Sequence, residues 1–458
     1  MGEPLASRAD VARLFGRVAF GATKTDLDTY AGMAYEAVVD RLLNIPDPAT
    51  RGPAVDDVNR ITQENGTSPE GAAMWWIDRM RTTPYPLEER MTLFWHDHWA
   101  TAAGEIPGIP GVMRQNQTLR IHSLGNFRTM CQALTLDGAM LQWLDGEQNV
   151  VGAPNENYAR EFFELFTLGV FPQRYTETDI REAARAFTGF VVDPTTNNGR
   201  FETSRHDTGT KHILNGVVGN KGANEYKRVV DIALAQPIAS RFVAYKLVQN
   251  VAYVPTSQNL LVDKDPLVEV VAAALRANSW SLKPAVRAML LSDHFRYAPA
   301  AQGKQSVRQP AEVTVHMAKV LNVAVSQGNG ASILYYTMSA AGQTLLRPPN
   351  VGGWPVGVGW LSPSTVTARY DLSVHANQLS LNSNPEPIRG LLLPPSSDVK
   401  TGGAQWAAFM GLAALSPTTA QAVKSFRTAR KAVPGVTETE LQSGIFLLLA
   451  NSPDWQVM

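Results

Sequence analysis

The segment 155–169 places several chemically active side chains on one face of a helix. Three carboxylates, an amide and a guanidinium share that face at about 100° per residue, opposite aromatic residues: Glu156, Asn157, Arg160, Glu161 and Glu164. Carboxylates this close repel one another, so the pKa of at least one should rise unless Arg160 or a metal ion compensates. The pattern makes Glu161 and Glu164 candidate general acids or bases, with Asn157 and Arg160 as substrate ligands. Ion pairs that only stabilise helices would give the same pattern.

A second candidate cluster is the run Trp95-His96-Asp97-His98-Trp99. Its flanking residues have helical spacing, and residues two apart on a helix point about 200° apart. At most one of the two histidines can therefore face a given site, and we expect His98 to be a catalytic residue. His96, His98, Glu161 and His206 are the candidate ligands of a divalent metal, because imidazole and carboxylate suit zinc or manganese. A buried core histidine is the alternative, and no cofactor is required by the spacing.

Two loops complete the candidate site. The turn-rich run 205–211 contains His206, Asp207 and Lys211, which resemble a cradle for an anion or a polar substrate. We expect His206 and Asp207 to be catalytic and Lys211 to bind substrate, in one cleft with the carboxylates of 155–169. Turn chemistry alone would explain the same residues. The Gly/Pro-rich run 347–360 offers Asn350 and Trp354 as substrate-binding residues, with Trp354 as an apolar wall for a flat ring. A rigid structural loop is an equal alternative for this run.

The bulk composition excludes some classes of protein. Lys plus Arg equals Asp plus Glu, 41 each, which argues against a nucleic-acid partner because such binding needs a basic excess. No apolar run is long enough to span a membrane. The single cysteine, Cys131, is expected in the core. No signal peptide begins the chain, so the sequence predicts a cytoplasmic protein, or one exported together with a partner that carries a signal.

The elements that would position these residues are mainly helices. Helical periodicity and capping patterns, such as Ser7 with Asp10 and Thr176 with Asp179, predict a mainly α fold. We expect one large multi-helical domain over residues 1–382, with a small β-hairpin insertion near 188–205 inside a hairpin and loop insertion over 188–224. Residues 383–404 are predicted to be a linker or long loop. Residues 405–458 are expected to form C-terminal helices that pack on the core.

Seven motifs in this chain resemble those of a bacterial family, domain of unknown function 1800. They lie at 13–23, 89–101, 155–161, 175–179, 186–190, 206–211 and 348–355. The resemblance implies one long, predominantly helical domain but no activity. It also implies export and a neighbouring partner, a sulfatase-like protein of the family called domain of unknown function 1501. The chain departs from this pattern in having no signal, and in having Phe166 where relatives often have His.

Two functions from different classes follow. The first is an enzyme that uses carboxylate and imidazole groups for acid–base catalysis, with or without a metal, in hydrolysis or transfer on a polar, glycan-like substrate. The alternative is a non-catalytic helical scaffold or export partner of the sulfatase-like protein, for which an exposed apolar patch would be the sign. Purely structural ion networks would explain the same motifs without a site.

Overall fold

Short-range capping determines where several helices begin. The computed structural model describes residues 4–46, 68–106, 108–171, 173–257, 259–260, 264–297, 306–325, 332–383 and 399–457. In it, Ser7 and Asp10 form the predicted capping box of α1 (Arg8–Val18). Thr176 and Asp179 do the same for α11 (Glu177–Ala186). In each box the side-chain oxygen accepts a backbone N–H that the helix itself leaves free.

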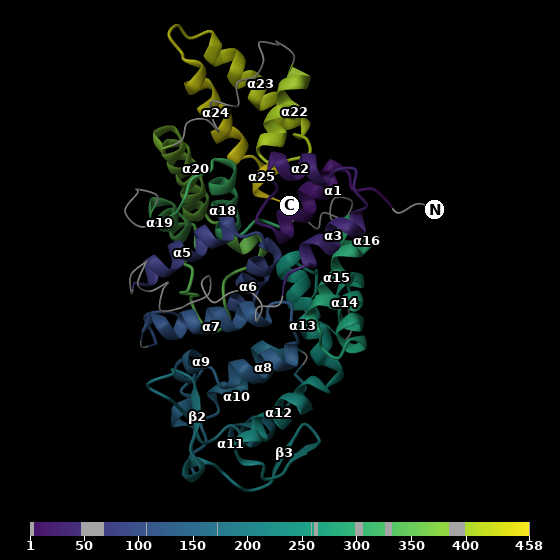
Figure 1. The fold of residues 1–458 in the computed structure, drawn as a ribbon, viewed down its shortest axis with the longest axis vertical. Helices are drawn as coiled ribbons and strands as arrows, with labels where there is room; N and C mark the ends of the chain where they lie inside the picture. Colours follow the sequence, from purple (N-terminus) through teal and green to yellow (C-terminus); the bar gives the residue numbers. More distant parts are fainter. Residues whose placement is uncertain are drawn as a thin grey trace.

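Helices form most of the described chain (Figure 1), and the predicted mainly α class is confirmed. One hydrophobic core is built largely from helices at the N-terminus and in the middle of the chain: α1, α2 (Lys24–Tyr30), α3 (Tyr35–Leu43), α8 (Phe127–Thr135), α12 (Glu225–Leu234), α13 (Pro237–Val251), α14 (Pro266–Ala277), α15 (Leu282–Leu291) and α16 (Asp293–Arg296).

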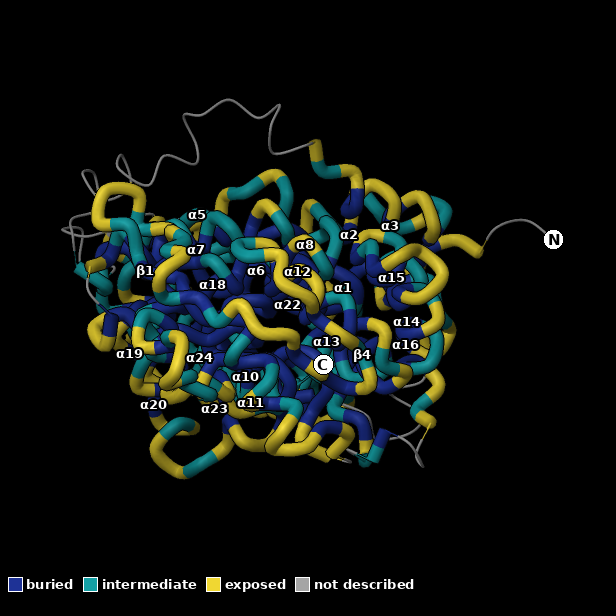
Figure 2. The backbone as a smooth tube through the Cα atoms, turned by 90° about the horizontal axis from the view of Figure 1, so that it is seen from below, coloured by how far each residue is buried: buried dark blue, intermediate teal, exposed yellow. Residues whose placement is uncertain are grey.

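A second hydrophobic core joins α5 to the later helices: α5 (Pro69–Thr82), α18 (Pro310–Val320), α19 (Ser332–Ala340), α20 (Pro363–Ser383), α22 (Val399–Phe409), α23 (Pro417–Lys431), α24 (Glu438–Ala450) and α25 (Pro453–Gln456). Helices α7 (Ile109–His122) and α9 (Gly138–Trp143) contribute to both cores. Buried backbone fills the middle of the molecule and exposed backbone its rim (Figure 2). No helix among the described residues has both the length and the apolarity needed to cross a bilayer.

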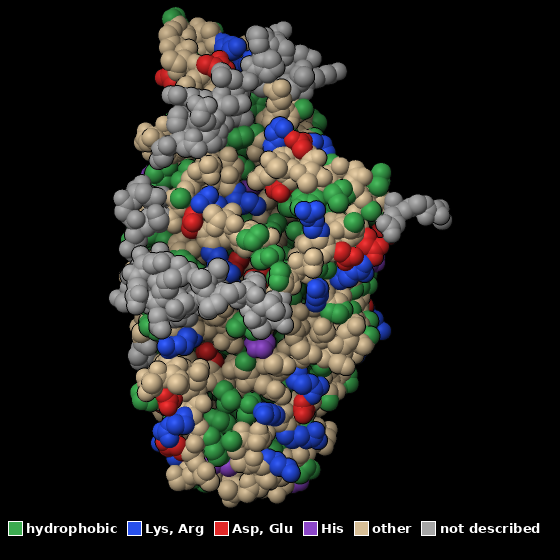
Figure 3. Space-filling view, viewed as in Figure 1, with side chains coloured by type: hydrophobic (Ala, Val, Ile, Leu, Met, Phe, Trp, Pro, Cys, Tyr) green, Lys and Arg blue, Asp and Glu red, His purple; other side chains and the backbone are tan. Residues whose placement is uncertain are grey.

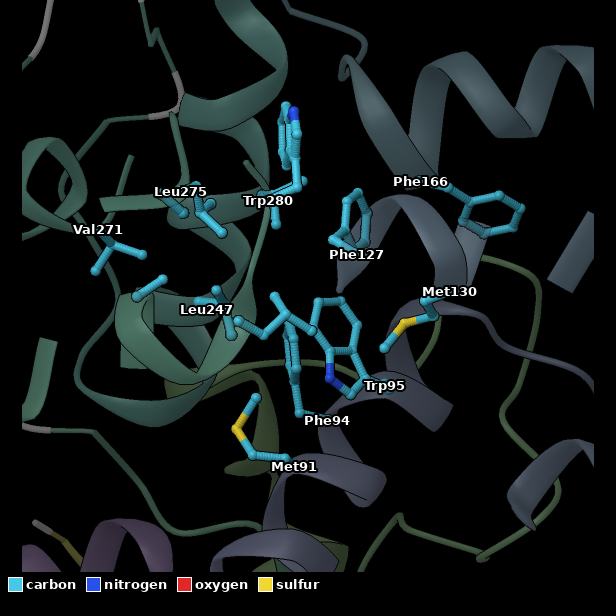
Figure 4. Close-up of a cluster of buried hydrophobic side chains, with 14 of the residues drawn as sticks. Met91, Phe94, Trp95, Phe127, Met130, Phe166, Leu247, Val271, Leu275 and Trp280 are labelled. Atoms are coloured by element: carbon cyan, nitrogen blue, oxygen red, sulfur yellow. The ribbon is translucent and has the colours of Figure 1, made fainter. Parts of the chain in front are cut away.

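Helix α6 (Pro86–His98) is buried on nearly all sides and lies between the two cores. Met91, Phe94 and Trp95 pack in the first core with Phe127 from α8 and Leu247 from α13 (Figure 4). Leu93, on another face, belongs to the second core. Polar residues also lie on α6, and two of them, Arg90 and Asp97, share one edge about 20° apart around the axis.

The predicted hairpin is confirmed, with β1 (Phe190–Val192) antiparallel to β2 (Gly199–Phe201) and Phe190 opposite Phe201. A second hairpin, β3 (Lys211–Ile213) with β4 (Gly216–Val218), lies in the stretch that the sequence suggested was an irregular loop. Its turn needs positive φ at Leu214 and Asn215. Neither residue is glycine, so the glycines of this stretch did not indicate where the turn lies.

The helix expected over 155–169 is interrupted. It consists of α10 (Asn157–Glu161) followed by a π-helical turn over Phe162–Thr167. Thr167 Oγ1 donates to the carbonyl oxygen of Phe162 at 2.5 Å. The N–H groups of Leu168 and Gly169 both donate to the carbonyl oxygen of Phe163. Such turns need tertiary partners, which a single-segment pattern does not contain.

The end of the described chain packs against its beginning. Trp455 Nε1 donates to the carbonyl oxygen of Met410 at 3.1 Å, and the backbone of Val457 pairs with Val307. A Cβ at Gly411 would lie 1.8 Å from the carbonyl oxygen of Ala22, so these segments touch directly. Helix α22 begins at Val399, so the last residues of the predicted 383–404 linker are helical; residues 384–398 lie outside the described parts.

Distant pairs also hold α1 and the residues that follow it in place. Arg296 Nε donates to Asp10 Oδ1 at 2.8 Å, across 286 residues of sequence. The ring of His316 lies with Nε2 2.8 Å from the carbonyl oxygen of Ala22, 294 residues earlier.

Candidate active site

The polar face of α10 is an ion network. Arg160 bonds Glu177 of α11 at 2.7 Å and Glu156 at 3.2 Å, and lies 3.6 Å from Glu164. Asn157 donates to Asp145 at 3.1 Å. Glu161 is half-buried, and burial together with the charge of Glu164 raises its pKa. Of the four residues predicted here, only Glu161 keeps a property expected of an acid–base group.

The residues predicted in the loop 205–211 also have local partners. His206 and Lys211 are buried around a carboxylate that the sequence analysis missed, Glu225 at the start of α12. Lys211 Nζ lies 2.5 Å from Glu225 Oε2, and His206 Nε2 lies 3.1 Å from Glu225 Oε1. Asp207 accepts two hydrogen bonds from Arg185 of α11, at 2.8 and 3.0 Å, which hold the pKa of its carboxyl below the usual range.

The structure does not bring these two groups of residues together. Both contact α11, but Arg160 reaches Glu177 at its beginning and Asp207 reaches Arg185 near its end. Eight residues of helix separate these contacts by about 12 Å along the axis. Glu164, Asp207 and His206 each have a charged neighbour of their own, and the predicted convergence of Glu161, Glu164, His206 and Asp207 does not occur.

His98 lies deep in an aromatic environment rather than in a cleft. Its Nε2–H donates to the carbonyl oxygen of Phe166 at 3.0 Å, and the rings of Phe94, Trp95 and Trp99 surround it. Burial lowers the pKa of His98 to about 3. The ring of Phe166 lies 6.0 Å from that of His98 between centroids.

His96 is equally buried, with its ring 5.5 Å from those of Trp76 and Trp354. Neither ring nitrogen has a hydrogen-bond partner among the described residues, and burial lowers the pKa of His96 to about 4. Both histidines are therefore neutral core residues on different faces of α6. Among the residues that the structure describes, no three His, Cys, Asp or Glu side chains are grouped so as to hold a metal ion.

Replacing His96 by Phe should make the protein more resistant to mild acid. The unfolded chain protonates this imidazole below pH 6.5, whereas the folded protein does so only near pH 4, so the wild type loses stability as pH falls between these values. At pH 5 this loss amounts to about 2 kcal/mol. The free energy of unfolding in urea would be measured at pH 7.5 and at pH 5. Its change between the two pH values should be smaller for His96→Phe than for the wild type. An equal difference in the two proteins would contradict this reading.

Asp97, between the two histidines, is the residue that the sequence analysis passed over. Its Oδ1 accepts the backbone N–H of Trp354 at 2.6 Å. A Cβ at Gly353, whose φ is +85°, would lie 2.3 Å from the same oxygen, so only glycine allows this approach. Burial raises the pKa of Asp97 to about 6, against the opposing influence of Lys246, the Trp354 N–H and Arg90. The residue is nevertheless only half-buried.

Lys246 of α13 is the cation that faces Asp97. It too is half-buried, and desolvation lowers its pKa while the charge of Asp97 raises it. It also influences His98, so it lies beside α6 at the level of residues 97 and 98. In the described part of the chain no carboxylate oxygen lies within 4 Å of its ammonium nitrogen. A carboxyl and an ammonium group thus face each other without forming a closed ion pair.

Asn250, one turn after Lys246, is held beside Asp97. Its Nδ2 lies 3.5 Å from Asp97 Oδ2. Arg90 donates to both its side-chain oxygen, at 2.8 Å, and its backbone oxygen, at 2.7 Å. Arg90 also bonds Glu312 of α18 at 2.9 Å. The guanidinium therefore fixes the orientation of the amide next to the carboxyl group.

Three of the seven motifs meet around this polar centre: 13–23 supplies Arg17, 89–101 supplies Arg90 and Asp97, and 348–355 supplies Gly353 and Trp354. The role of the last motif differs from the expected one. The indole of Trp354 is buried against His96, and its backbone N–H contacts the site. Asn350 accepts the N–H of Gly352 at 2.8 Å, within its own turn. The spacing of Arg90 and Asp97 on one helix edge was the signal available in the sequence.

A hollow of about 1350 Å³ lies elsewhere, between α1, α3, α15 and the turn before α6. Its rim carries Asp40, Arg41 and Lys283, and none of the predicted site residues lines it. Asp40 there is paired with Arg287 at 2.7 Å. We therefore place the candidate active site at Asp97 and Lys246.

The family model described as "Protein of unknown function (DUF1800)" matches residues 13–457 of the chain. Comparison with curated proteins and with solved structures gave no match.

Proposed function

Since the chain belongs to the DUF1800 family, whose description carries no activity, we propose from the geometry that it is an enzyme with Asp97 as its acid–base group. The reaction would be hydrolysis or transfer on a polar substrate that carries a negative charge. The observation that carries this proposal is the half-buried Asp97, whose pKa is raised to about 6, facing Lys246. Among the described residues, no carboxylate oxygen lies within 4 Å of the Lys246 ammonium nitrogen.

The two groups would have complementary tasks. Above pH 6 the Asp97 carboxylate accepts a proton from the attacking water or hydroxyl group, and the protonated acid then returns a proton to the leaving group. Lys246 attracts the negative charge of the substrate and stabilises the charge that develops on the reacting oxygen. Trp354 N–H and Asn250 hold the carboxylate in position. Activity should rise as pH passes 6 and fall again when Lys246 loses its proton.

The proposed substrate class follows from the charge of Lys246 and not from stacking on the indole of Trp354. The indole of Trp354, expected to stack on a sugar ring, is buried, so the glycan-like part of the prediction has no support from this residue. A half-buried ammonium without a carboxylate within 4 Å in the described chain favours a substrate with a carboxylate, phosphate or sulfate group.

Replacing Lys246 by Met tests the proposal. The change removes a desolvated ammonium that has no ion pair in the described chain, so the melting temperature should stay equal or rise while turnover falls at least tenfold. Nitrophenyl phosphate, sulfate, carboxylic esters and glucuronide would be assayed with wild type, Lys246→Met and the exposed control Lys283→Met. Turnover by Lys246→Met at the wild-type rate would contradict the proposal. Direct NMR titration of Asp97 gives an answer that needs no substrate: a pKa near 4 would also contradict it.

One observation favours the second candidate, a scaffold or export partner of a sulfatase-like protein. Exposed apolar residues gather where α19, α20 and the turn before α20 meet: Tyr336, Val358, Leu361, Val366 and Tyr370. Elsewhere, the face in Figure 3 mixes basic and acidic side chains without a field of one sign. Co-expression with a sulfatase-like neighbour should recover a complex that Tyr370→Glu weakens and the exposed control Val151→Glu does not. Recovery of no complex would exclude this candidate.

A further inference from the structure

The hollow of about 1350 Å³ beside the turn before α6 lies where the two hydrophobic cores meet. Phe15 of α1 and Leu42 of α3 line it from the first core. Met80, near the end of α5, lines it from the second core. Pockets for organic ligands usually have volumes of about 300–1000 Å³, so this hollow has room for a small organic molecule and not only for an ion.

Lys319, at the end of α18, brings a positive charge to the wall of this hollow. The residue is half-buried, and its Nζ donates to the carbonyl oxygens of Ala19 and Gly21, both at 3.0 Å, just after α1. An ammonium group has three N–H donors, so one of them has no acceptor among the described residues. Burial lowers the pKa of Lys319 although the charge of Asp26 opposes this change, which indicates that the ammonium charge is incompletely compensated.

Arg81, in the last turn of α5, supplies a second positive charge to the same hollow. Its side chain is 15% exposed, and its Nε donates to Asp78 Oδ1 at 2.8 Å. Asp78 is held in turn by the backbone N–H of Val325, at 3.2 Å. The two terminal nitrogens of Arg81 have no acceptor within the part of the chain that the structure describes. Guanidinium groups bind phosphate and carboxylate through such nitrogens.

The carboxylates on the lining are already engaged by other residues. Basic side chains outnumber them, and the two described carboxylates are Asp26 and Asp40. Asp26 accepts the backbone N–H and the hydroxyl group of Thr23, each at 2.7 Å. Asp40 accepts two hydrogen bonds from Arg287, at 2.7 and 3.0 Å. A ligand in this hollow would therefore meet N–H donors that lack an acceptor, which favours a ligand with negative charge.

We propose that this hollow binds an organic phosphate, with the phosphate group at Arg81 and Lys319 and the organic group against the apolar wall. A phosphate monoester carries about two negative charges at neutral pH and three strong acceptor oxygens, which match two cations with spare donors. Phe15 and Tyr30, whose ring centroids lie 5.0 Å apart, offer apolar contacts to the organic group. The proposal does not rest on the proposed catalytic activity, because Asp97 and Lys246 are not among the lining residues.

Phenylphosphonate is the probe for the full chain, because it has the charge of an organic phosphate but no ester bond to hydrolyse. Titration calorimetry and thermal unfolding would be compared for phenylphosphonate, inorganic phosphate and the dicarboxylate phthalate at one ionic strength. We expect saturable binding of phenylphosphonate that raises the melting temperature by several degrees, and binding of the other two that is weaker by about tenfold or more. No saturable binding of phenylphosphonate, or equal binding of either other anion, would overturn the proposal.

Three variants locate the binding. Arg81→Met should weaken it by about tenfold or more. Arg8→Met is the matched control, because it also removes an arginine bonded to an aspartate, Asp28 at 2.7 Å, but Arg8 does not line the hollow. Arg8→Met and Lys246→Met should both bind as the wild type does. Unchanged binding in Arg81→Met, or loss of binding in Lys246→Met, would overturn the assignment.

A crystallographic measurement on the wild type decides the question should Arg81→Met not fold. Crystals grown with 4-bromophenylphosphonate would be measured at the bromine absorption edge. We expect an anomalous peak against the apolar wall of the hollow, beside Tyr30, and a peak elsewhere would overturn the assignment. None of these readouts depends on turnover, so this site and the catalytic proposal can fail separately.

Discussion

Asp97→Asn is expected to lower turnover by roughly 10²–10⁴-fold, the usual contribution of a general acid or base. The substitution keeps an oxygen that can accept the Trp354 N–H, so the loop 347–360 should stay in place. The substitution removes the ability of this side chain to accept a proton and return it. Steady-state kinetics on the substrate that the wild type turns over would measure the loss.

The same substitution should stabilise the protein above pH 6. The pKa of Asp97 is raised from 3.8 to about 6 in the folded state, so the folded protein binds more protons than the unfolded chain between these values. Stability therefore falls as pH rises from 4 to 6, by at most about 3 kcal/mol, and stays low above that range. Urea unfolding should show Asp97→Asn as more stable than wild type at pH 7.5 and equal to it at pH 4.

Asp137 provides the matched control. Burial also raises its pKa to about 6, but it caps α9 through the Met140 N–H and accepts from Gln115 in the core. Asp137→Asn should change the pH dependence of stability in the same direction and leave turnover unchanged, because asparagine also caps helices. Loss of turnover in Asp137→Asn equal to that in Asp97→Asn would show that a general effect of buried carboxyl groups, and not catalysis by Asp97, is being measured.

Glu225→Gln should destabilise the protein by about 3 kcal/mol or more, because it leaves the buried Lys211 ammonium without its charge partner. Lys211 and Glu225 have no exposed side-chain surface, and this pair ties the β3–β4 hairpin to α12. The midpoint of urea unfolding would measure the loss. Proteolysis should then cut first within 199–224, since the hairpin would open before the helical cores.

The control for this effect is an exposed ion pair in the same insertion. Glu202 pairs with Arg200 at the surface, and Glu202→Gln should cost less than about 1 kcal/mol. The double variant Lys211→Met with Glu225→Leu should recover part of the stability, because it removes both charges together. If Glu225→Gln is as stable as Glu202→Gln, the buried pair does not hold the insertion.

Local chemistry in the sequence was sufficient to predict several elements. The Ser7 and Thr176 capping boxes and the first hairpin depend on residues only a few positions apart, and all three are found in the structure. The second hairpin and the π-helical turn were missed. Both depend on backbone conformations, at Leu214 and around Phe162, that neighbouring segments stabilise.

The candidate site was predictable only in part. The helical reading of 91–98 correctly separated His96 from His98, but it did not show that both side chains are enclosed by aromatic rings. Asp97 became a candidate only when Trp354 and Lys246, more than 140 residues away, were placed beside it. Glu225 had no pattern of its own, because its partners Lys211 and His206 precede it in a different element.

The contacts of α1 and of the residues that follow it also bear on how the protein folds during synthesis. Asp10 is paired with Arg296, and Ala22 with His316, nearly 300 residues later in the chain. During translation the native partners of this segment are synthesised only nearly 300 residues later. It cannot form these contacts until they have left the ribosome. Such long-range closure slows folding and exposes apolar surface meanwhile. Truncated chains that stop before residue 296 lack both partners and should therefore aggregate or require chaperones, even though their own helices are intact.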